Sequence, residues 1–314
     1  MRIVIVGAGS LGSAIGGLLG LAGHDVTLVT RNEAHVAAIV ARGGLRLHDG
    51  ATTVLAPVRA AADYDAVGVV DLAIVLVKSF DTTNAVAAAM AAVGDDTVVL
   101  SLQNGVGCEA QIAEVVGAER VVAGRTFVGG RLTEPGVVEY GVVGRHTVIG
   151  ELDGALSLRI EQLAAAFNDA GLSTTVSDDI RVTMWDKLLV NVATGAWSAL
   201  TGLPYGELSI EPHVERAAIA TVAEAMDVAL AMGIPITEAD PEVPWRLAWE
   251  GLPYGFKASM LQSVEKGTRT EVDVIHGAVC RGGRDVGVPT PINDTLLAAV
   301  LGVERRLAIA RGVA

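Results

Sequence analysis

The first twelve residues, Met1-Arg-Ile-Val-Ile-Val-Gly-Ala-Gly-Ser-Leu-Gly12, place an apolar β-rich run directly before the pattern Gly-x-Gly-x-x-Gly. The first glycine of this pattern permits a tight turn, and the second lets backbone N–H groups approach a pyrophosphate. The third permits close packing of helix on strand, and the helix N-terminus favours negative charge. Because 37 glycines make chance matches common, the strand before and the helix formers after the motif carry the argument. The residues expected to hold a dinucleotide are Gly7, Ala8, Gly9, Ser10, Leu11 and Gly12.

Short β-rich runs alternate with helical segments from Met1 to about Ser177. The runs are Ile3–Val6, Val26–Thr30, Leu72–Val77, Val98–Leu102 and Val121–Val128, and the helical segments include Ser10–Leu21 and Asp81–Val93. Apolar strands that alternate with helices predict a parallel sheet covered on both faces. Leu45–Val58 and Val137–Gly150 are typical of small antiparallel excursions, with turn signals at Pro135-Gly136 and Val143-Gly144.

The chain after Ser177 is predicted to be helical. The expected helices are Asp178–Leu200, Pro212–Met232, Phe256–Glu265, Val272–Asp285 and Pro291–Ala310. Ser177-Asp178-Asp179 is typical of a helix start, because a side-chain oxygen can cap it and acids suit its first turn. Pro212 and Pro291 suit a first helical position. We therefore predict an α/β protein with an N-terminal Rossmann-type doubly wound parallel sheet in 1–177 and a C-terminal all-helical domain in 178–314.

Composition excludes several classes of protein. At 314 residues, 51% hydrophobic and 19% charged, the chain can bury two cores and is not disordered. A net charge of −13 without a Lys/Arg block argues against nucleic-acid binding. No run approaches the roughly 18 apolar residues of a membrane span, and no signal peptide is expected. Cys108, Cys280 and six scattered histidines show no metal-ligand spacing, so we expect no metal and a reduced, soluble, cytoplasmic chain.

The end of the second predicted strand indicates the cofactor type. It reads Thr30-Arg31-Asn32, without the acid that an NAD enzyme usually offers to the ribose 2′-hydroxyl. A guanidinium can bind a 2′-phosphate bidentately, so we expect NADP (NADPH), the alternative being a solvated surface arginine. Lys78 and Asn104 follow the next two strands, at the edge where such sheets bind ligands, although Asn-Gly is also a common turn.

The segment Trp185–Ser198 is the candidate catalytic helix. Lys187 and Asn191 are one helical turn apart in surroundings that are otherwise largely apolar. A buried lysine has a lowered pKa and can act as an acid near neutral pH. The alternative is a lysine whose stem packs on the helix while its ammonium reaches solvent.

Five marks, taken together and in this order, resemble the ketopantoate reductase (2-dehydropantoate 2-reductase) family over essentially the whole chain. They are the glycine motif, Val77-Lys78, Gln103-Asn104-Gly105, Trp-x-Lys-Leu-x-x-Asn at 185–191, and Ser259-Met-Leu-Gln262 followed by Arg269-Thr-Glu-Val-Asp273. The resemblance implies that Lys187 donates a proton to the substrate carbonyl while NADPH delivers hydride. It implies a substrate set of Asn104, Asn191 and Ser259, a Glu271 near Lys187 and the nicotinamide ribose, and further cofactor contacts at Arg31, Lys78, Asn104 and Gly129. Read alone, Glu271 could be a surface acid and Ser259 a helix cap.

Three departures from the family pattern bear on the substrate. Gly195-Ala196 stands where the family usually has asparagine and proline, and Tyr205 corresponds to a further substrate asparagine. His276 precedes Gly277 where the family usually has another asparagine. Loss of hydrogen-bonding amides changes which hydroxyl groups a pocket recognises.

The resemblance leads to one principal hypothesis and two alternatives. The first is NADPH-dependent reduction of a 2-keto acid, 2-dehydropantoate to pantoate, for pantothenate (vitamin B5) biosynthesis. The second is a relative that acts on another branched or larger 2-keto acid or on a D-2-hydroxy acid. The third is a cofactor-sensing protein, which would need neither Lys187 nor Glu271. A small-molecule substrate and a homodimer through the helical domain complete the expectations.

Overall fold

The computed structural model describes residues 1–142 and 144–312, which cluster into two compact units. The first unit comprises Met1–Gln103 and Cys108–Ile180, and the second comprises Asn104–Gly107 and Arg181–Ala314. The second unit thus includes a tetrapeptide from the middle of the first, which the sequence did not predict. Each unit has its own core.

The first unit is built on an eight-stranded sheet with the order β12-β11-β8-β7-β6-β1-β2-β5. Neighbouring strands are parallel in every pair except β8–β11, which is antiparallel. The strands are β1 Arg2–Val6, β2 Asp25–Val29, β5 Arg59–Ala61, β6 Val70–Val75, β7 Val93–Ser101, β8 Val121–Thr126, β11 Thr147–Glu151 and β12 Thr174–Val176. This confirms the predicted, mostly parallel Rossmann-type sheet.

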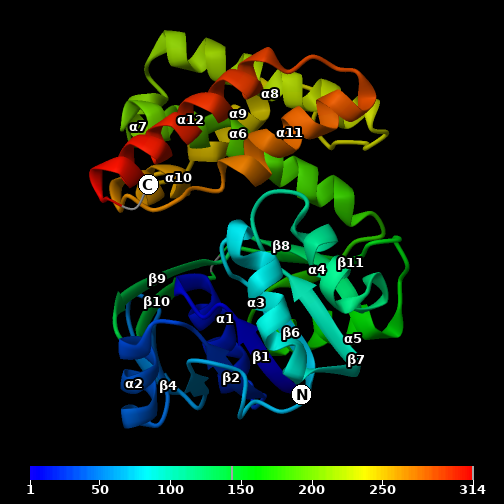
Figure 1. Cartoon of the computed structure of the whole chain (residues 1–314), viewed down its shortest axis with the longest axis vertical. Helices are drawn as coiled ribbons and strands as arrows, with labels where there is room; N and C mark the ends of the chain where they lie inside the picture. The colour runs from blue at the N-terminus through cyan, green and yellow to red at the C-terminus, as the bar shows by residue number, and fades with distance from the viewer. Residues whose placement is uncertain (143, 313–314) are drawn as a thin grey trace. The chain divides into compact units, whose positions relative to one another are not determined.

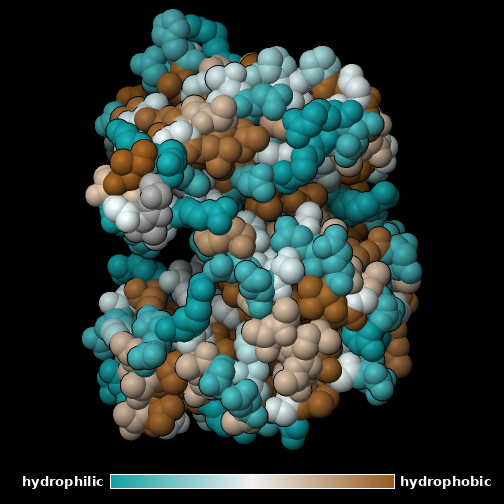
Figure 2. All heavy atoms as spheres, in the orientation of Figure 1, coloured by the Kyte–Doolittle hydropathy of each residue, from teal (hydrophilic) through white to brown (hydrophobic). Residues whose placement is uncertain are grey.

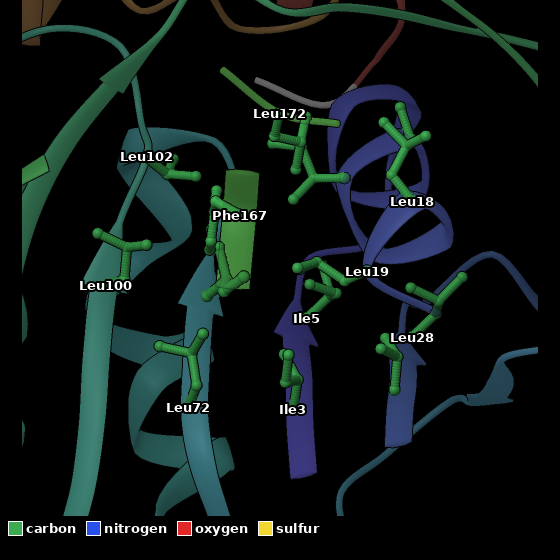
Figure 3. Packing of buried hydrophobic residues seen from close by; sticks show 14 of the residues in the cluster. Ile3, Ile5, Leu18, Leu19, Leu28, Leu72, Leu100, Leu102, Phe167 and Leu172 are labelled. Carbon is green, nitrogen blue, oxygen red and sulfur yellow. The ribbon is translucent and has the colours of Figure 1, made fainter. Parts of the chain in front are cut away.

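Helices cover both faces of this sheet because its central strands are apolar on both sides. Alternate residues of β1 enter two different cores: Ile3 and Ile5 pack with α1 (Ser10–Leu21) and α5 (Leu158–Asp169). Val4 and Val6 pack with α3 (Thr82–Ala88) and α4 (Cys108–Val116). Figure 3 shows the first core, where leucines of α1 and Phe167 of α5 surround the β1 isoleucines. The coverage of both faces is as predicted.

A smaller four-stranded sheet, β4-β3-β10-β9, lies beside α1 (Figure 1). Its strands are β3 Leu45–His48, β4 Thr53–Ala56, β9 Gly129–Glu134 and β10 Val137–Gly141. The β3–β4 and β9–β10 pairs are antiparallel, while β10 runs parallel to β3. The prediction of a single excursion over Val137–Gly150 was wrong in part: β10 pairs with β9, whereas β11 joins the main sheet. The Pro135-Gly136 turn is present with Gly136 at φ +74, and Val143 of the second signal lies outside the described residues.

The second unit is helical, and its described part from 181 to 312 contains no strand. Its helices are α6 Ile180–Thr201, α7 Tyr205–Leu208, α8 Pro212–Ala231, α9 Glu242–Trp249, α10 Ser259–Glu265, α11 Val272–Val286 and α12 Pro291–Ala310. Pro212 and Pro291 occupy first helical positions, as predicted. Residues of α6, α8, α10, α11 and α12 share one apolar core.

Several predicted boundaries were wrong for local reasons. The segment Asp81–Val93 is helical only to Ala88, after which a 3-10 turn leads into β7 at Val93. Strand β6 ends at Val75, and α10 begins at Ser259. Helix α6 begins at Ile180, so Asp178 and Asp179 precede its first turn, and the Ser177 hydroxyl accepts from Asp179 N–H (3.2 Å).

Apolar and polar side chains are interspersed over the face of the molecule drawn in Figure 2. Within 1–142 and 144–312, no helix is long and apolar enough to cross a membrane. Both cysteines are buried.

Candidate functional site

The geometry of the loop between β1 and α1 shows why glycine stands at each of its three motif positions. Gly7 has φ +97, and an added Cβ would lie 2.5 Å from Val77 Cγ1. An added Cβ on Gly12 would lie 2.6 Å from the Gly7 carbonyl oxygen, so helix and strand could not approach so closely. Gly9, the N-cap of α1, faces open space, with no atom within 4 Å of an added Cβ. The loop therefore leaves the helix N-terminus accessible to an anion.

Two basic residues flank this loop on either side. Strands β6 and β2 are the two neighbours of β1, so their carboxyl ends lie beside the glycine loop. Arg31 follows β2, and its Nη2 donates to Asp81 Oδ2 (2.6 Å) while 87% of its side chain is exposed. Lys78 follows β6, and its carbonyl accepts from Asp81 N–H (2.8 Å). Asp81 thus connects the two basic residues.

Gln103 fixes the ends of two strands, a role that we did not predict for it. Its Nε2 donates to the Val77 carbonyl (2.9 Å) and to Thr82 Oγ1 (2.8 Å), and the side chain is 3% exposed. Val77 is also the residue that packs against Gly7. Gln103 therefore holds in place Val77, the residue on which Gly7 of the glycine loop packs. Its place in the motif Gln-Asn-Gly was the only sequence signal.

Strand β9 packs directly on the glycine loop. Its first residue, Gly129, has open space around an added Cβ, whereas one on Gly130 would lie 2.6 Å from the Ser10 carbonyl oxygen. The Leu132 N–H donates to Ser10 Oγ (3.0 Å). Gly129 is therefore next in sequence to a residue that packs on the loop.

Helix α6 presents Lys187 and Asn191 one turn apart, and both are half-buried. Leu188 and Val192, next to them in sequence, are buried in the core of the second unit. On the other flank, Asp186 accepts from the backbone N–H (3.0 Å) and the hydroxyl of Thr237. These contacts fix the rotation of the helix about its axis.

The segment Asn104–Gly107 docks on the start of α11. Val106 N–H donates to the Val274 carbonyl (2.9 Å), and an added Cβ on Gly105 would lie 2.5 Å from Val274. Glu271 is the N-cap residue of this helix and only 7% exposed. Asn104 and Glu271 are therefore held at the same end of α11.

Helices α6, α10 and α11 meet in one core through Val192, Met260 and Ile275. The second unit therefore gathers Lys187, Asn191, Ser259, Glu271 and Asn104 on elements that pack together. Gly7, Ala8, Gly9, Ser10, Leu11, Gly12, Arg31, Lys78 and Gly129 belong to the first unit.

His276 does not have the exposure of a substrate-pocket residue. It is 0% exposed, and its Nδ1 lies 2.9 Å from Asn293 Oδ1. The Asn293 amide donates to the Thr221 carbonyl and to Glu224, so its Oδ1 is the acceptor and His276 Nδ1 carries the proton. Burial lowers the pKa of His276 to about 4. The side chain therefore belongs to the core of the second unit, which argues against a direct contact with substrate.

Among the described residues, no group of three or more His, Cys, Asp or Glu side chains is placed to hold a metal ion. A parallel sheet with a glycine-rich turn at its central strand, joined to a helical unit with a half-buried lysine, is typical of nicotinamide-dependent oxidoreductases.

Comparison with known proteins identifies the family. The ketopantoate reductase PanE/ApbA family matches residues 3–154, and its C-terminal domain matches residues 179–304. The chain is 39% identical to a 2-dehydropantoate 2-reductase of Halobacterium salinarum, over 94% of this chain and 96% of that protein. It is 37% identical to one of Archaeoglobus fulgidus, over 98% and 99%. The chain belongs to the ketopantoate reductase family.

Solved structures agree with this assignment. A PanE/ApbA family ketopantoate reductase from Ralstonia eutropha superposes with a TM-score of 0.89 at 35% identity, over 98% of this chain and 99% of that one. A D-mandelate dehydrogenase solved with NADH and anilino(oxo)acetate superposes with a TM-score of 0.90 at 26% identity, over 98% and 99%.

Proposed function

We propose that this enzyme reduces a 2-keto acid to a 2-hydroxy acid with NADPH, and that its substrate is 2-dehydropantoate, the precursor of pantoate in pantothenate biosynthesis. The observation that carries the proposal is that Lys187 and Asn191 lie on α6, and Asn104 and Glu271 at the start of α11, two helices that share one apolar core. The family membership and the glycine loop support it.

The proposed chemistry divides between cofactor and protein. NADPH, when bound, supplies a hydride to the 2-keto carbon. Lys187 gives its proton to the carbonyl oxygen, and its ammonium stabilises the negative charge that develops there. Asn104, Asn191 and Ser259 bind the carboxylate and oxygens of the substrate, and Glu271 orients Lys187.

The residues of the first unit fit a phosphorylated dinucleotide. The open space at Gly9 and the N-terminus of α1 suit the pyrophosphate. Arg31, with most of its side chain in solvent, can offer a 2′-phosphate its remaining donors, and Lys78 adds a second positive charge. A carboxylate in place of Arg31 would instead favour NADH.

A second substrate class, a 2-keto acid with an apolar or aromatic side chain, is favoured by the surroundings of Gly195. This residue lies one turn beyond Asn191 on the same face of α6, and the nearest atoms to an added Cβ belong to Met260 (3.4 Å to Cε). Tyr205 stacks on Phe256 (centroids 5.7 Å apart) and accepts from Thr194 Oγ1. Such groups offer fewer hydrogen bonds to substrate hydroxyls than asparagines would.

A substrate panel decides between these two classes. We expect NADPH oxidation, followed by absorbance, to be faster with 2-dehydropantoate than with phenylglyoxylate or 2-keto-isovalerate. A higher kcat/KM for the two unhydroxylated acids would transfer the assignment to the second class. Absence of turnover with all three, alongside tight NADPH binding, would favour the sensor.

Location and assembly remain proposals. A cytoplasmic location is consistent with two buried cysteines that are far apart in the sequence. A homodimer through the helical unit is testable by light scattering coupled to size-exclusion chromatography.

A further inference from the structure

Three buried hydrogen bonds connect the β9–β10 turn to the glycine-rich loop through two side chains. Gly136 N–H donates to His35 Nδ1 (2.9 Å), and His35 Nε2 lies 3.0 Å from Ser13 Oγ. Ser13 Oγ in turn donates to the Ala8 carbonyl (3.2 Å). The side chains of His35 and Ser13 are both 0% exposed. None of these groups belongs to the cofactor-contacting set described above except Ala8.

The donors fix the protonation state of His35. A backbone N–H can only donate, so Nδ1 must be an acceptor and carry no proton. The proton of the neutral ring is therefore on Nε2, which donates to Ser13 Oγ, leaving the hydroxyl proton for Ala8. The bond from Gly136 therefore requires a neutral imidazole, whereas the other two use only the Nε2 proton and the Ser13 hydroxyl proton. A proton added at Nδ1 would face the Gly136 N–H and break the first bond.

Ser13 controls two consecutive peptide groups of the loop. Its hydroxyl binds the Ala8 carbonyl, and its backbone N–H donates to the Gly9 carbonyl (2.9 Å). In a trans peptide the carbonyl and the following N–H point in opposite directions. Holding these two carbonyls therefore sets the direction of the N–H groups of Gly9 and Ser10, the N-cap and the first residue of α1.

The turn itself is coupled to the same loop by a second route. Leu132, in the strand that leads into the turn, donates to Ser10 Oγ (3.0 Å). His35 is in turn held at the start of α2 (Glu33–Arg42), where its N–H donates to the N-cap Asn32 Oδ1 (3.1 Å). A displacement of the β9–β10 hairpin would therefore also displace the glycine-rich loop.

We propose that His35 is a positioning residue for cofactor binding, which holds the hairpin and the glycine loop in register only while its imidazole is neutral. The inference rests on the proposed function, in which this loop binds NADPH. It assigns to His35 and Ser13 an effect on affinity for the dinucleotide and not on the chemical step.

The surroundings of His35 favour the neutral ring. Burial lowers its pKa below the ordinary value. Helix α1 carries no charged residue. The charged groups on the other packed elements are Glu33 and Arg42 on α2, Arg131 and Glu134 on β9, and Glu139 on β10. Arg42 binds the Pro135 carbonyl (3.0 Å) and pairs with Glu134 (3.7 Å), and Glu139 pairs with Arg131.

The test titrates NADPH and NADH into the full chain at several pH values from 5 to 8, by nicotinamide fluorescence. Ser13→Ala should raise both dissociation constants about three- to tenfold, the loss of roughly one hydrogen bond, with kcat at saturation unchanged. His35→Gln should bind more weakly at pH 8 but lose the decline that the wild type shows at acidic pH. NADH, which lacks the 2′-phosphate, separates this decline from titration of that phosphate.

Thr97→Val is the matched control, because Thr97 is buried in the same unit and its hydroxyl donates to the Val70 carbonyl at the other end of the sheet. It should lower the melting temperature without changing either dissociation constant. Ser13→Ala with the affinity of the control, or a wild-type pH profile in His35→Gln, would overturn the inference. A wild-type chain that binds neither nucleotide would overturn the proposed function instead.

Discussion

Arg31 donates a charge-assisted hydrogen bond of 2.6 Å to Asp81, which joins the loop after β2 to the loop after β6. The pair is exposed on the arginine side, with 87% of the Arg31 side chain in solvent against 28% for Asp81. The candidate anchor for a 2′-phosphate therefore already has a carboxylate partner. Cofactor selectivity depends on the competition between these two anions for one guanidinium.

Arg31→Ala should abolish most of the preference for NADPH. A charge-assisted contact of this kind contributes about 1.5–3 kcal/mol, so the ratio of kcat/KM for NADPH to that for NADH should fall ten- to a hundredfold. The kcat/KM for NADH should change little. Equal use of the two cofactors by the unaltered enzyme would contradict the assignment of Arg31.

Asp81→Asn should strengthen NADPH binding. The substitution removes a competing negative charge, and an exposed ion pair contributes at most about 1 kcal/mol, so a two- to fivefold lower dissociation constant is expected. NADH serves as the internal control. Weaker NADPH binding in this variant would show that Asp81 orients Arg31 and does not compete for it.

Gly105→Ala should impair substrate turnover by displacing Asn104. Gly105 has φ +82, and its added Cβ would lie 2.5 Å from Val274. Strain of about 1–3 kcal/mol corresponds to a loss of roughly five- to 150-fold in kcat/KM for the keto acid. Gly107→Ala is the control, because Gly107 also has positive φ (+107) but open space around an added Cβ. Equal effects of the two changes would mean that backbone strain, and not the packing on Val274, governs the loop.

His276 should make stability fall as the pH falls. Its pKa is about 4 in the folded chain against 6.5 when unfolded. The unfolded chain therefore gains a proton first, and stability is full above pH 6.5 and declines between 6.5 and 4. The decline should reach roughly 2 kcal/mol by pH 5. Urea unfolding at pH 7.5 and pH 5 measures it, with His276→Gln as comparison. The same slope in that variant would assign the loss to other groups, among them His35, whose pKa burial also lowers.

The sequence predicted those elements whose ends are marked by a nearby glycine or proline. Helix α1 has the predicted bounds because the glycine motif determines its start, and Pro212 and Pro291 mark the starts of α8 and α12. What it could not show depends on contacts between distant segments. The parallel pairing of β10 with β3 is one example, and the assignment of Asn104–Gly107 to the second unit is another.

The candidate site was predictable to a similar extent. Motif spacing pointed to the glycine loop, Lys187 and Asn191. No local signal marked His35, since its role depends on Gly136, about a hundred positions away. The burial of His276 was not predicted for the same reason, because its partner Asn293 is on another helix. The expected division of the chain after Ser177 stays a prediction, which limited proteolysis can test.

The turnover of Lys187→Ala tests the central claim most directly. Removing the proposed general acid should lower kcat with 2-dehydropantoate by at least about 100-fold, and Lys187→Arg should restore little because a guanidinium is too weak an acid. NADPH titration of both variants should give a dissociation constant near that of the wild type, since the proposed cofactor contacts are elsewhere. A Lys187→Ala enzyme with near-normal kcat would contradict the account and leave the proton donor unassigned.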